Sequence, residues 1–299
     1  MSQNLFAVQG TQTTLNGRPF LVKGLRCSNA LLSDATAGEL IAHLDAFAGY
    51  GVNTVSVYWM GNRFGDVRGY REDGSLDPVY AARFERIIEA ADARAMAVLV
   101  GCLYWGDSRS KWESWTQIEA NTAVYNTVAW LREHDYRNVF VDVDNEGMAL
   151  RSAGFDNRQL LRAGKVADPT CIMATNFRGD PPPEADLAIH FSNRDPAKPY
   201  IESEGSPRGL PDGSGYWGPY SNQRDGSYNY AHIGQYTPEM KESQKALARE
   251  HLDQGEGYLL ASTWLQCPPP GPYPCPGGDG SSAEPGIRWW LEWLREQYG

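Results

Sequence analysis

Acidic side chains stand at the ends of two apolar segments of the sequence, and their placement indicates a specific chemistry. Glu146 closes the run Asn138–Glu146, and Glu202 and Glu204 lie near the end of Pro199–Gly205. Two carboxyl groups on facing strand ends suit cleavage of a glycosidic bond, because one protonates the leaving oxygen while the other attacks the sugar or activates water. Glu202 and Glu204 share one face of an extended strand, so either can be the second carboxyl group.

Large aromatic side chains gather at the ends of similar segments. Flat rings of this kind stack on the apolar faces of pyranose rings, so we expect them to contact a sugar. The residues concerned are Trp59, Tyr104, Trp105 and Trp264 at strand ends and Trp217 in a long loop.

Eight short apolar runs, most of them separated by amphipathic stretches, must position these residues. Near-continuous apolar character predicts strands of a parallel sheet that is covered on both faces. The predicted strands are Lys23–Ser28, Asn53–Met60, Ala97–Trp105, Asn138–Glu146, Cys171–Phe177, Leu187–Asn193, Pro199–Gly205 and Tyr258–Cys267. The predicted helices are Glu39–Tyr50, Asp77–Ala95, Glu113–Glu133 and Glu284–Tyr298.

Eight such units in a chain of 299 residues predict an α/β fold, a single (β/α)8 TIM barrel over residues 1–299. Strands five and six are followed by gaps too short for full helices, so units five and six are abbreviated. An open doubly wound sheet is the alternative, but it would require a glycine-rich first turn, and KGLRCSN contains no such turn. In a barrel, the carboxyl ends of the strands line the substrate-binding mouth.

Three further segments have recognisable patterns. An Asn16-Gly17 pair predicts a β-hairpin within residues 1–22. Residues 206–235 form a long loop rich in glycine and tyrosine between the seventh and eighth strands, and loops of that length usually cover a site. Cys267 and Cys275 bracket CPPPGPYPC and either form a disulfide in an oxidising compartment or remain free thiols.

Composition excludes several classes of function. The chain has 37 acidic and 27 basic residues, a net charge of −10 and 41% hydrophobic residues. This acidity argues against nucleic-acid and membrane-surface partners, and no apolar run is long enough to span a bilayer. No zinc, phosphate-loop or nucleophile-elbow motif occurs, so we expect no cofactor or metal. No signal peptide is evident, which predicts a cytoplasmic protein unless a leader was removed. The sequence does not indicate the oligomeric state.

Several segments together resemble the retaining glycoside hydrolases of clan A, the cellulase-like (β/α)8 superfamily. TLNGRPFLVKG is similar to the lead-in to the first strand, YGVNTVSVYW to the second strand, and VDNEG to the end of the fourth. KPYIESEG resembles the nucleophile segment, and YLLASTWLQ resembles the tryptophan region of the eighth strand. The resemblance implies a carbohydrate substrate and double displacement at an O-glycosidic bond.

The resemblance also implies roles for individual residues. Glu146 would be the acid/base, Asn145 would bind the sugar 2-hydroxyl, and Glu204, five residues after a proline, would be the nucleophile. Glu202 remains the alternative nucleophile. Retention implies carboxyl groups about 5–5.5 Å apart.

The chain departs from the family pattern near the site. Ser56 stands where cellulase-like members carry an arginine, Cys102 and Tyr104 stand where they carry a histidine, and no tyrosine follows His190 closely. Arg26, at the end of the first strand, could replace the missing arginine. His190 is either a core histidine or a substrate contact.

Two other functions fit some of the same residues. Asp142, Asp144 and His190, together with the three glutamates, supply enough ligands for a metal-dependent sugar isomerase or lyase. A non-catalytic carbohydrate-binding protein would keep the barrel and its aromatic rim. We interpret the two aspartates as structural, bonded to Arg26, Lys23 or backbone amides, although a bulge could turn one of them outward.

Overall fold

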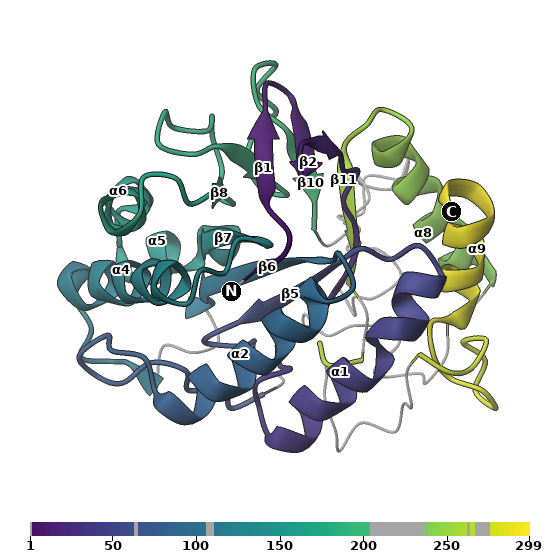
Figure 1. The fold of residues 1–299 in the computed structure, drawn as a ribbon, viewed down its shortest axis with the longest axis horizontal. Coiled ribbons are helices and arrows are strands. Elements are labelled where there is room, and N and C mark those ends of the chain that lie inside the picture. Colours follow the sequence, from purple (N-terminus) through teal and green to yellow (C-terminus); the bar gives the residue numbers. More distant parts are fainter. Residues whose placement is uncertain are drawn as a thin grey trace.

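Eight parallel strands close into a barrel in a computed structural model that describes residues 2–62, 65–105, 111–203, 236, 238–261, 264–266 and 276–299 (Figure 1). In barrel order the strands are β4 (Lys23–Arg26), β5 (Thr54–Tyr58), β6 (Ala97–Leu103), β7 (Val139–Asp144), β8 (Met173–Thr175), β9 (Leu187–Ile189), β10 (Tyr200–Glu202) and β11 (Gly257–Leu260). The (β/α)8 fold is confirmed.

Helices cover the outside of the barrel, as Figure 1 shows. They are α1 (Asp34–Gly49), α2 (Pro78–Asp92), α4 (Gln117–Glu133), α5 (Met148–Ala153), α6 (Asn157–Ala167), α8 (Pro238–Leu252) and α9 (Arg288–Tyr298). Side chains that cap backbone amides fix three of the starts: Ser33 caps α1, Asp77 caps α2 and Thr116 caps α4. Helices α5, α6 and α8 were not predicted from the sequence.

The fifth and sixth units are abbreviated, as predicted. Within residues 111–203, turns and bends without a helix join β8 to β9 and β9 to β10. Although α6 packs against β8, no crossover helix therefore lies between β8 and β9 or between β9 and β10. This gap leaves room for a hollow between β10 and α8, described below.

The N-terminal segment forms a small antiparallel sheet of three strands rather than a single hairpin. These are β1 (Phe6–Gln9), β2 (Gln12–Leu15) and β3 (Arg18–Pro19). Asn16 and Gly17 both have positive φ, 55° and 73°, as a tight two-residue turn requires. The Phe6 ring stacks on Phe140 of β7 with centroids 4.8 Å apart, so this sheet covers the amino ends of the strands.

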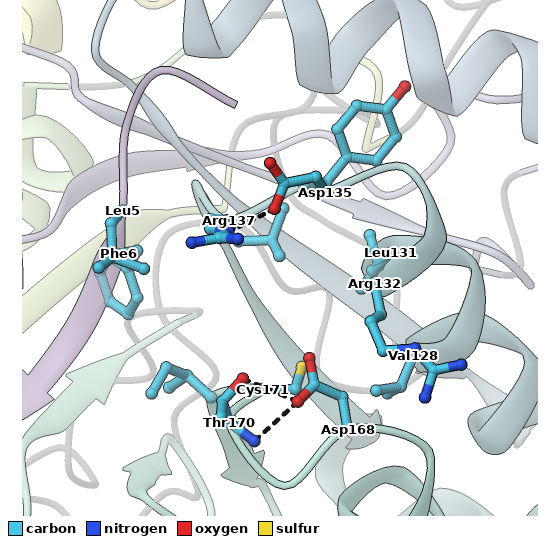
Figure 2. Close-up of a pocket in the computed structure, with 13 residues that line it drawn as sticks. Leu5, Phe6, Val128, Leu131, Arg132, Asp135, Arg137, Asp168, Thr170 and Cys171 are labelled. Atoms are coloured by element: carbon cyan, nitrogen blue, oxygen red, sulfur yellow. Dashed lines mark hydrogen bonds and ion pairs between the residues drawn. The ribbon is translucent and has the colours of Figure 1, made fainter. Parts of the chain in front are cut away.

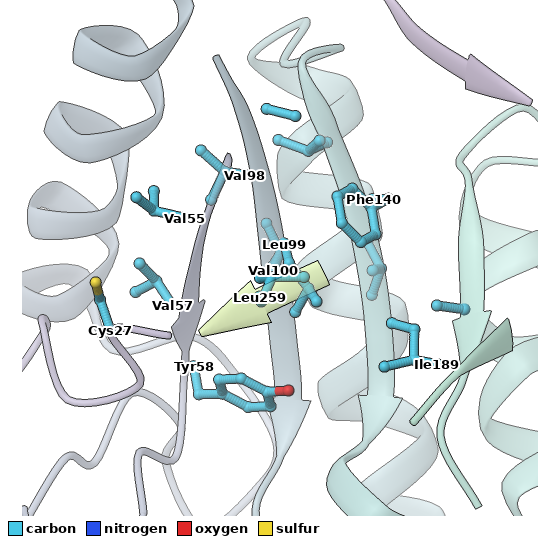
Figure 3. Packing of buried hydrophobic residues seen from close by; sticks show 14 of the residues in the cluster. Cys27, Val55, Val57, Tyr58, Val98, Leu99, Val100, Phe140, Ile189 and Leu259 are labelled. Carbon is cyan, nitrogen blue, oxygen red and sulfur yellow. The ribbon is translucent and has the colours of Figure 1, made fainter. Parts of the chain in front are cut away.

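Apolar side chains fill the barrel interior (Figure 3). Leu99, Phe140, Ile189 and Leu259 are fully buried there. Nearer the carboxyl ends the filling becomes polar, because the Tyr58 ring crosses the interior. Gly101 makes this possible, since a Cβ at this position would lie 2.0 Å from the Tyr58 ring. The polar cluster therefore lies above the apolar layers, toward the carboxyl ends of the strands.

Several segments that were singled out from the sequence lie outside the described residues. These are Glu204, Trp217, the loop 206–235, and the cysteines 267 and 275.

Candidate active site

Glu146 lies on a strained turn immediately after β7. Its φ is 54° and that of Gly147 is 62°, so two successive residues adopt the left-handed conformation. This conformation is unfavourable for a non-glycine residue and is often found at functional sites. The Glu146 side chain is 11% exposed, and its Oε2 lies 3.8 Å from Nη2 of Arg151 on α5. The turn therefore presents a nearly buried carboxyl group at the barrel mouth.

Side chains from three other strands or strand ends fix Asn145, the residue before this turn. Its Oδ1 accepts hydrogen bonds from Arg26 Nη2 at 3.0 Å, Tyr58 Oη at 3.2 Å and Asn176 Nδ2 at 3.4 Å. The side chain is fully buried, and its Nδ2 forms no hydrogen bond within the described residues. The amide orientation is thus set, with Nδ2 as the remaining donor.

Arg26 connects the end of β7 with the end of β10. Besides Asn145 it contacts Ser203, since Nη1 donates to Ser203 Oγ at 3.1 Å. The guanidinium is fully buried and lies 5.5 Å from the Tyr58 ring centroid and 6.0 Å from that of Tyr104. A positive charge is therefore held inside the mouth, beside the residue that precedes Glu204.

Two buried aspartates below Glu146 have structural partners. Asp142 accepts hydrogen bonds from Tyr58 Oη at 2.8 Å and Asn176 Nδ2 at 3.0 Å. Asp144 instead accepts from the backbone amides of Ala149 at 2.9 Å and Leu150 at 3.2 Å, at the start of α5. Burial raises the pKa of both carboxyl groups, that of Asp144 to about 7. Asp144 thus bonds backbone amides, as predicted, and links the residue before the Glu146 turn to the helix that follows the turn.

Asp144 is expected to make the fold less stable as the pH rises toward 7. Its carboxyl pKa is about 7 in the folded chain, but about 3.9 in an unfolded chain. Between these values the folded state keeps a proton that the unfolded state has lost, so the free energy of unfolding falls by up to about 4 kcal/mol. Urea unfolding of wild type and Asp144→Asn at several pH values measures this, and the variant should lose that part of the slope. Parallel curves for the two proteins would contradict the assignment.

Glu202 lies on the outer face of the barrel, not inside it. Its backbone is in register with Tyr258, whose ring packs toward α9, while the neighbouring Ile201 is in register with Ile189 inside the barrel. The Glu202 carboxylate is hydrogen-bonded to His190 Nδ1 and accepts from Tyr200 Oη at 3.2 Å.

These groups line a hollow of about 400 Å³ that α8 also borders, through Leu247, Glu250 and His251. Its position corrects the expectation that the Glu202 carboxyl group lies inside the barrel mouth. The outward direction of Glu202 therefore argues against it as the nucleophile. His190 lies at the end of β9, with its Nδ1 facing this outer hollow.

Three predicted stacking tryptophans are in the core. Trp59 packs against Phe84 and Trp130 with centroids 5.0 and 5.5 Å away, because Tyr58 points inward and its neighbour must point outward. Trp264 packs on α1 and donates from Nε1 to Glu39 at 3.0 Å. Trp105 packs against Trp115 and Phe155. All three are at most 3% exposed, which corrects the expectation of open stacking faces. Tyr104 lies at the mouth beside Arg26, but at 4% exposed it also lacks an open stacking face.

A second hollow, of about 530 Å³, lies at the opposite end of the barrel, between β1, α4 and the amino end of β7. Figure 2 shows that its charged groups are engaged with neighbours. Arg137 is paired with Asp135, and Asp168 accepts from the Thr170 amide at 2.8 Å. Residues at this end of a (β/α)8 barrel usually contribute to stability, whereas catalysis takes place at the opposite end.

The described part of the chain holds neither a metal-binding cluster nor a membrane-spanning helix. No group of three or more His, Cys, Asp or Glu side chains within the described residues is arranged to hold a metal ion. No described helix is both long enough and apolar enough to cross a bilayer.

Sequence reasoning missed several residues that build this region. Tyr58 carries the polar cluster but was overlooked beside the more conspicuous Trp59. Arg151 and Ser203 were also missed, the first because α5 was not predicted. Strand alternation was the available signal for Tyr58, since only one of two adjacent residues can face the interior.

Comparison with known proteins identifies the architecture. No family model and no curated protein matches the chain. Solved structures do match: a glycoside hydrolase family 5 protein from Bacteroides vulgatus ATCC 8482 has a TM-score of 0.61 at 15% identity, over 97% of this chain and 68% of that one. A beta-1,4-D-mannanase from Cryptopygus antarcticus has a TM-score of 0.58 at 12% identity, over 99% and 96%. The catalytic domain of Thermobifida fusca endoglucanase Cel5A has 0.53 at 14%, over 98% and 97%. The chain shares their fold.

Proposed function

We propose, from the barrel that this chain shares with those enzymes, that it is a retaining glycoside hydrolase. The observation that carries the proposal is the cluster at the mouth, in which Arg26 joins Asn145, beside Glu146, to Ser203, beside Glu204. The residues that precede two glutamates far apart in the sequence thus bond to one buried cation, which supports the proposal that both carboxyl groups act at one site.

Glu146 serves as the acid/base in this proposal. It first protonates the leaving oxygen and then removes a proton from the incoming water. Its strained turn is held on one side by Asn145 and on the other by Asp144, which restrains the carboxyl group before substrate binds. Asn145 Nδ2, whose orientation is set by three donors to Oδ1, donates to a sugar hydroxyl.

Glu204 serves as the nucleophile. β10 ends at Glu202, so strand alternation does not extend the outward direction of Glu202 to Glu204. Arg26 stabilises the ionised carboxylate that attack requires, which compensates for the serine at position 56. Residues 26 and 56 are in register on adjacent strands, so an arginine on either strand reaches the same region.

The substrate is a β-linked polysaccharide or oligosaccharide. The names of the structural neighbours support this class, since they include a mannanase, an endoglucanase and a beta-glucanase. Tyr104 and Tyr58 flank Arg26, but both are about as buried as the tryptophans, so neither provides an open stacking face among the described residues.

The stereochemistry of the first product tests the proposal. Proton NMR during cleavage of β-1,4-linked glucan and mannan oligosaccharides should show the β-anomer first, because two displacements at the anomeric carbon restore its configuration. An α-anomer as the first product would mean inversion by a single displacement. Absence of hydrolysis across both series would contradict the proposed function itself.

A further inference from the structure

Two arginines converge on one aromatic ring at the barrel mouth. Phe191 follows β9, and its ring centroid lies 5.4 Å from Cζ of Arg178 and 5.8 Å from Cζ of Arg151. Arg178 follows β8, and Arg151 belongs to α5, which follows β7. The three residues therefore come from the carboxyl ends of three strands that are neighbours in the barrel.

This cluster adjoins the proposed acid/base. Arg151 Nη2 is 3.8 Å from Glu146 Oε2, a distance longer than a hydrogen bond. Half of the Arg151 side chain is exposed, so the guanidinium retains donors that point away from Glu146. A group bound beside Glu146 would meet this cation.

Of the two arginines, Arg178 has the charge that is less balanced by nearby carboxylates. Within the described residues it forms no ion pair, and its guanidinium lies over the Phe191 ring. Several other described arginines are neutralised: Arg158 and Arg162 both pair with Glu184, and Arg194 pairs with Glu256. In a chain with a net charge of −10, an exposed cation that no carboxylate balances, next to the active site, requires a reason.

We propose that this cluster binds an anionic substituent of the sugar, a carboxylate or a sulfate ester, next to the bond that is cut. Guanidinium groups bind such anions through paired, charge-assisted hydrogen bonds, and the Phe191 ring holds both guanidinium groups in place. This inference rests on the proposed hydrolase function and narrows its substrate to acidic glycans, which the neutral sugars named for the structural neighbours do not include.

The test uses matched oligosaccharides. Three series of β-1,4-linked gluco-oligosaccharides are compared: neutral, oxidised at C6 to the carboxylate, and sulfated at C6. We expect kcat/KM of the wild type to be at least about tenfold higher for one of the anionic series than for the neutral series. This preference should shrink as the salt concentration rises, because exposed charges are screened.

Variants assign the preference to the cluster. Arg178→Gln should lose the preference, with kcat/KM on the favoured anionic series falling about tenfold and on the neutral series staying within about twofold. Arg162→Gln, on α6 and paired with Glu184, is the matched control and should behave as wild type on all three series.

The outcomes distinguish anion binding by the arginine cluster from the hydrolase function. Preference for the carboxylate or for the sulfate alone identifies which anion the cluster binds. Equal cleavage of neutral and anionic series, or an anionic preference that survives in Arg178→Gln, would overturn the inference while leaving the hydrolase function intact. Failure to cleave any of these series or the mannan series of the product test would overturn the hydrolase function and this inference with it.

Discussion

Replacing Glu146 with glutamine should lower kcat/KM on substrates with poor leaving groups by about 10²–10⁴-fold. Glutamine cannot donate the proton that an alkoxide leaving group needs, so glycosylation of the enzyme becomes slow. Aryl glycosides with an activated phenol leave without protonation, and their first step should be nearly unaffected. The two substrate classes should therefore separate sharply in the variant.

Added nucleophiles provide a second test of Glu146→Gln. Azide needs no base to activate it, so it should accelerate turnover of the activated substrate in Glu146→Gln and leave a glycosyl azide of retained configuration. Asp180→Asn, at an exposed position on the loop after β8, serves as the control and should not respond. Equal losses on good and poor leaving groups would exclude the acid/base role.

Glu204→Gln should abolish activity on all substrates, with kcat lower by more than about 10⁴-fold. In this case leaving-group ability offers no rescue, because the group that forms the covalent intermediate is missing. Folding should be retained, since the substitution keeps the volume of the side chain. Circular dichroism and thermal unfolding check that requirement before the kinetics are read.

Covalent trapping identifies the nucleophile directly. A 2-deoxy-2-fluoro glycoside with an activated leaving group should accumulate as a glycosyl-enzyme, and the labelled peptide should contain Glu204. Glu202→Gln provides the comparison, because that residue faces the hollow beside α8. Labelling at Glu202, or activity that survives in Glu204→Gln, would require a different nucleophile.

The barrel could be predicted from the sequence because its strands are buried on both faces and appear as continuous apolar runs. Their ends could not: β8 covers only Met173–Thr175 of the predicted Cys171–Phe177. Hydrophobicity does not indicate the residue at which the hydrogen bonds between strands end. Helix α6 was not predicted, although Asp156 caps it and its apolar face is well formed. Its interval contains no continuous apolar run of the kind from which the strands were predicted.

Side-chain direction was the main limit on predicting the site. Strand ends located Arg26, Asn145 and Glu146 at the mouth, but they also placed Trp59 and Glu202 there. One residue of register moves a side chain from the interior to the helix layer, so a strand-end position leaves its direction open. The partners of Asn145 come from three separate strands or strand ends, and only the closed barrel brings them together.

The small N-terminal sheet has a consequence for how the chain reaches its native state. Ser2 bonds to Asn138, 136 positions later, and β4 pairs with β11 near the other end of the chain. Segments made first during synthesis therefore wait for partners made much later, and such long-range closure slows folding. Until then Phe6 lacks Phe140 as a cover, so the nascent chain carries an exposed apolar segment of the kind that chaperones bind.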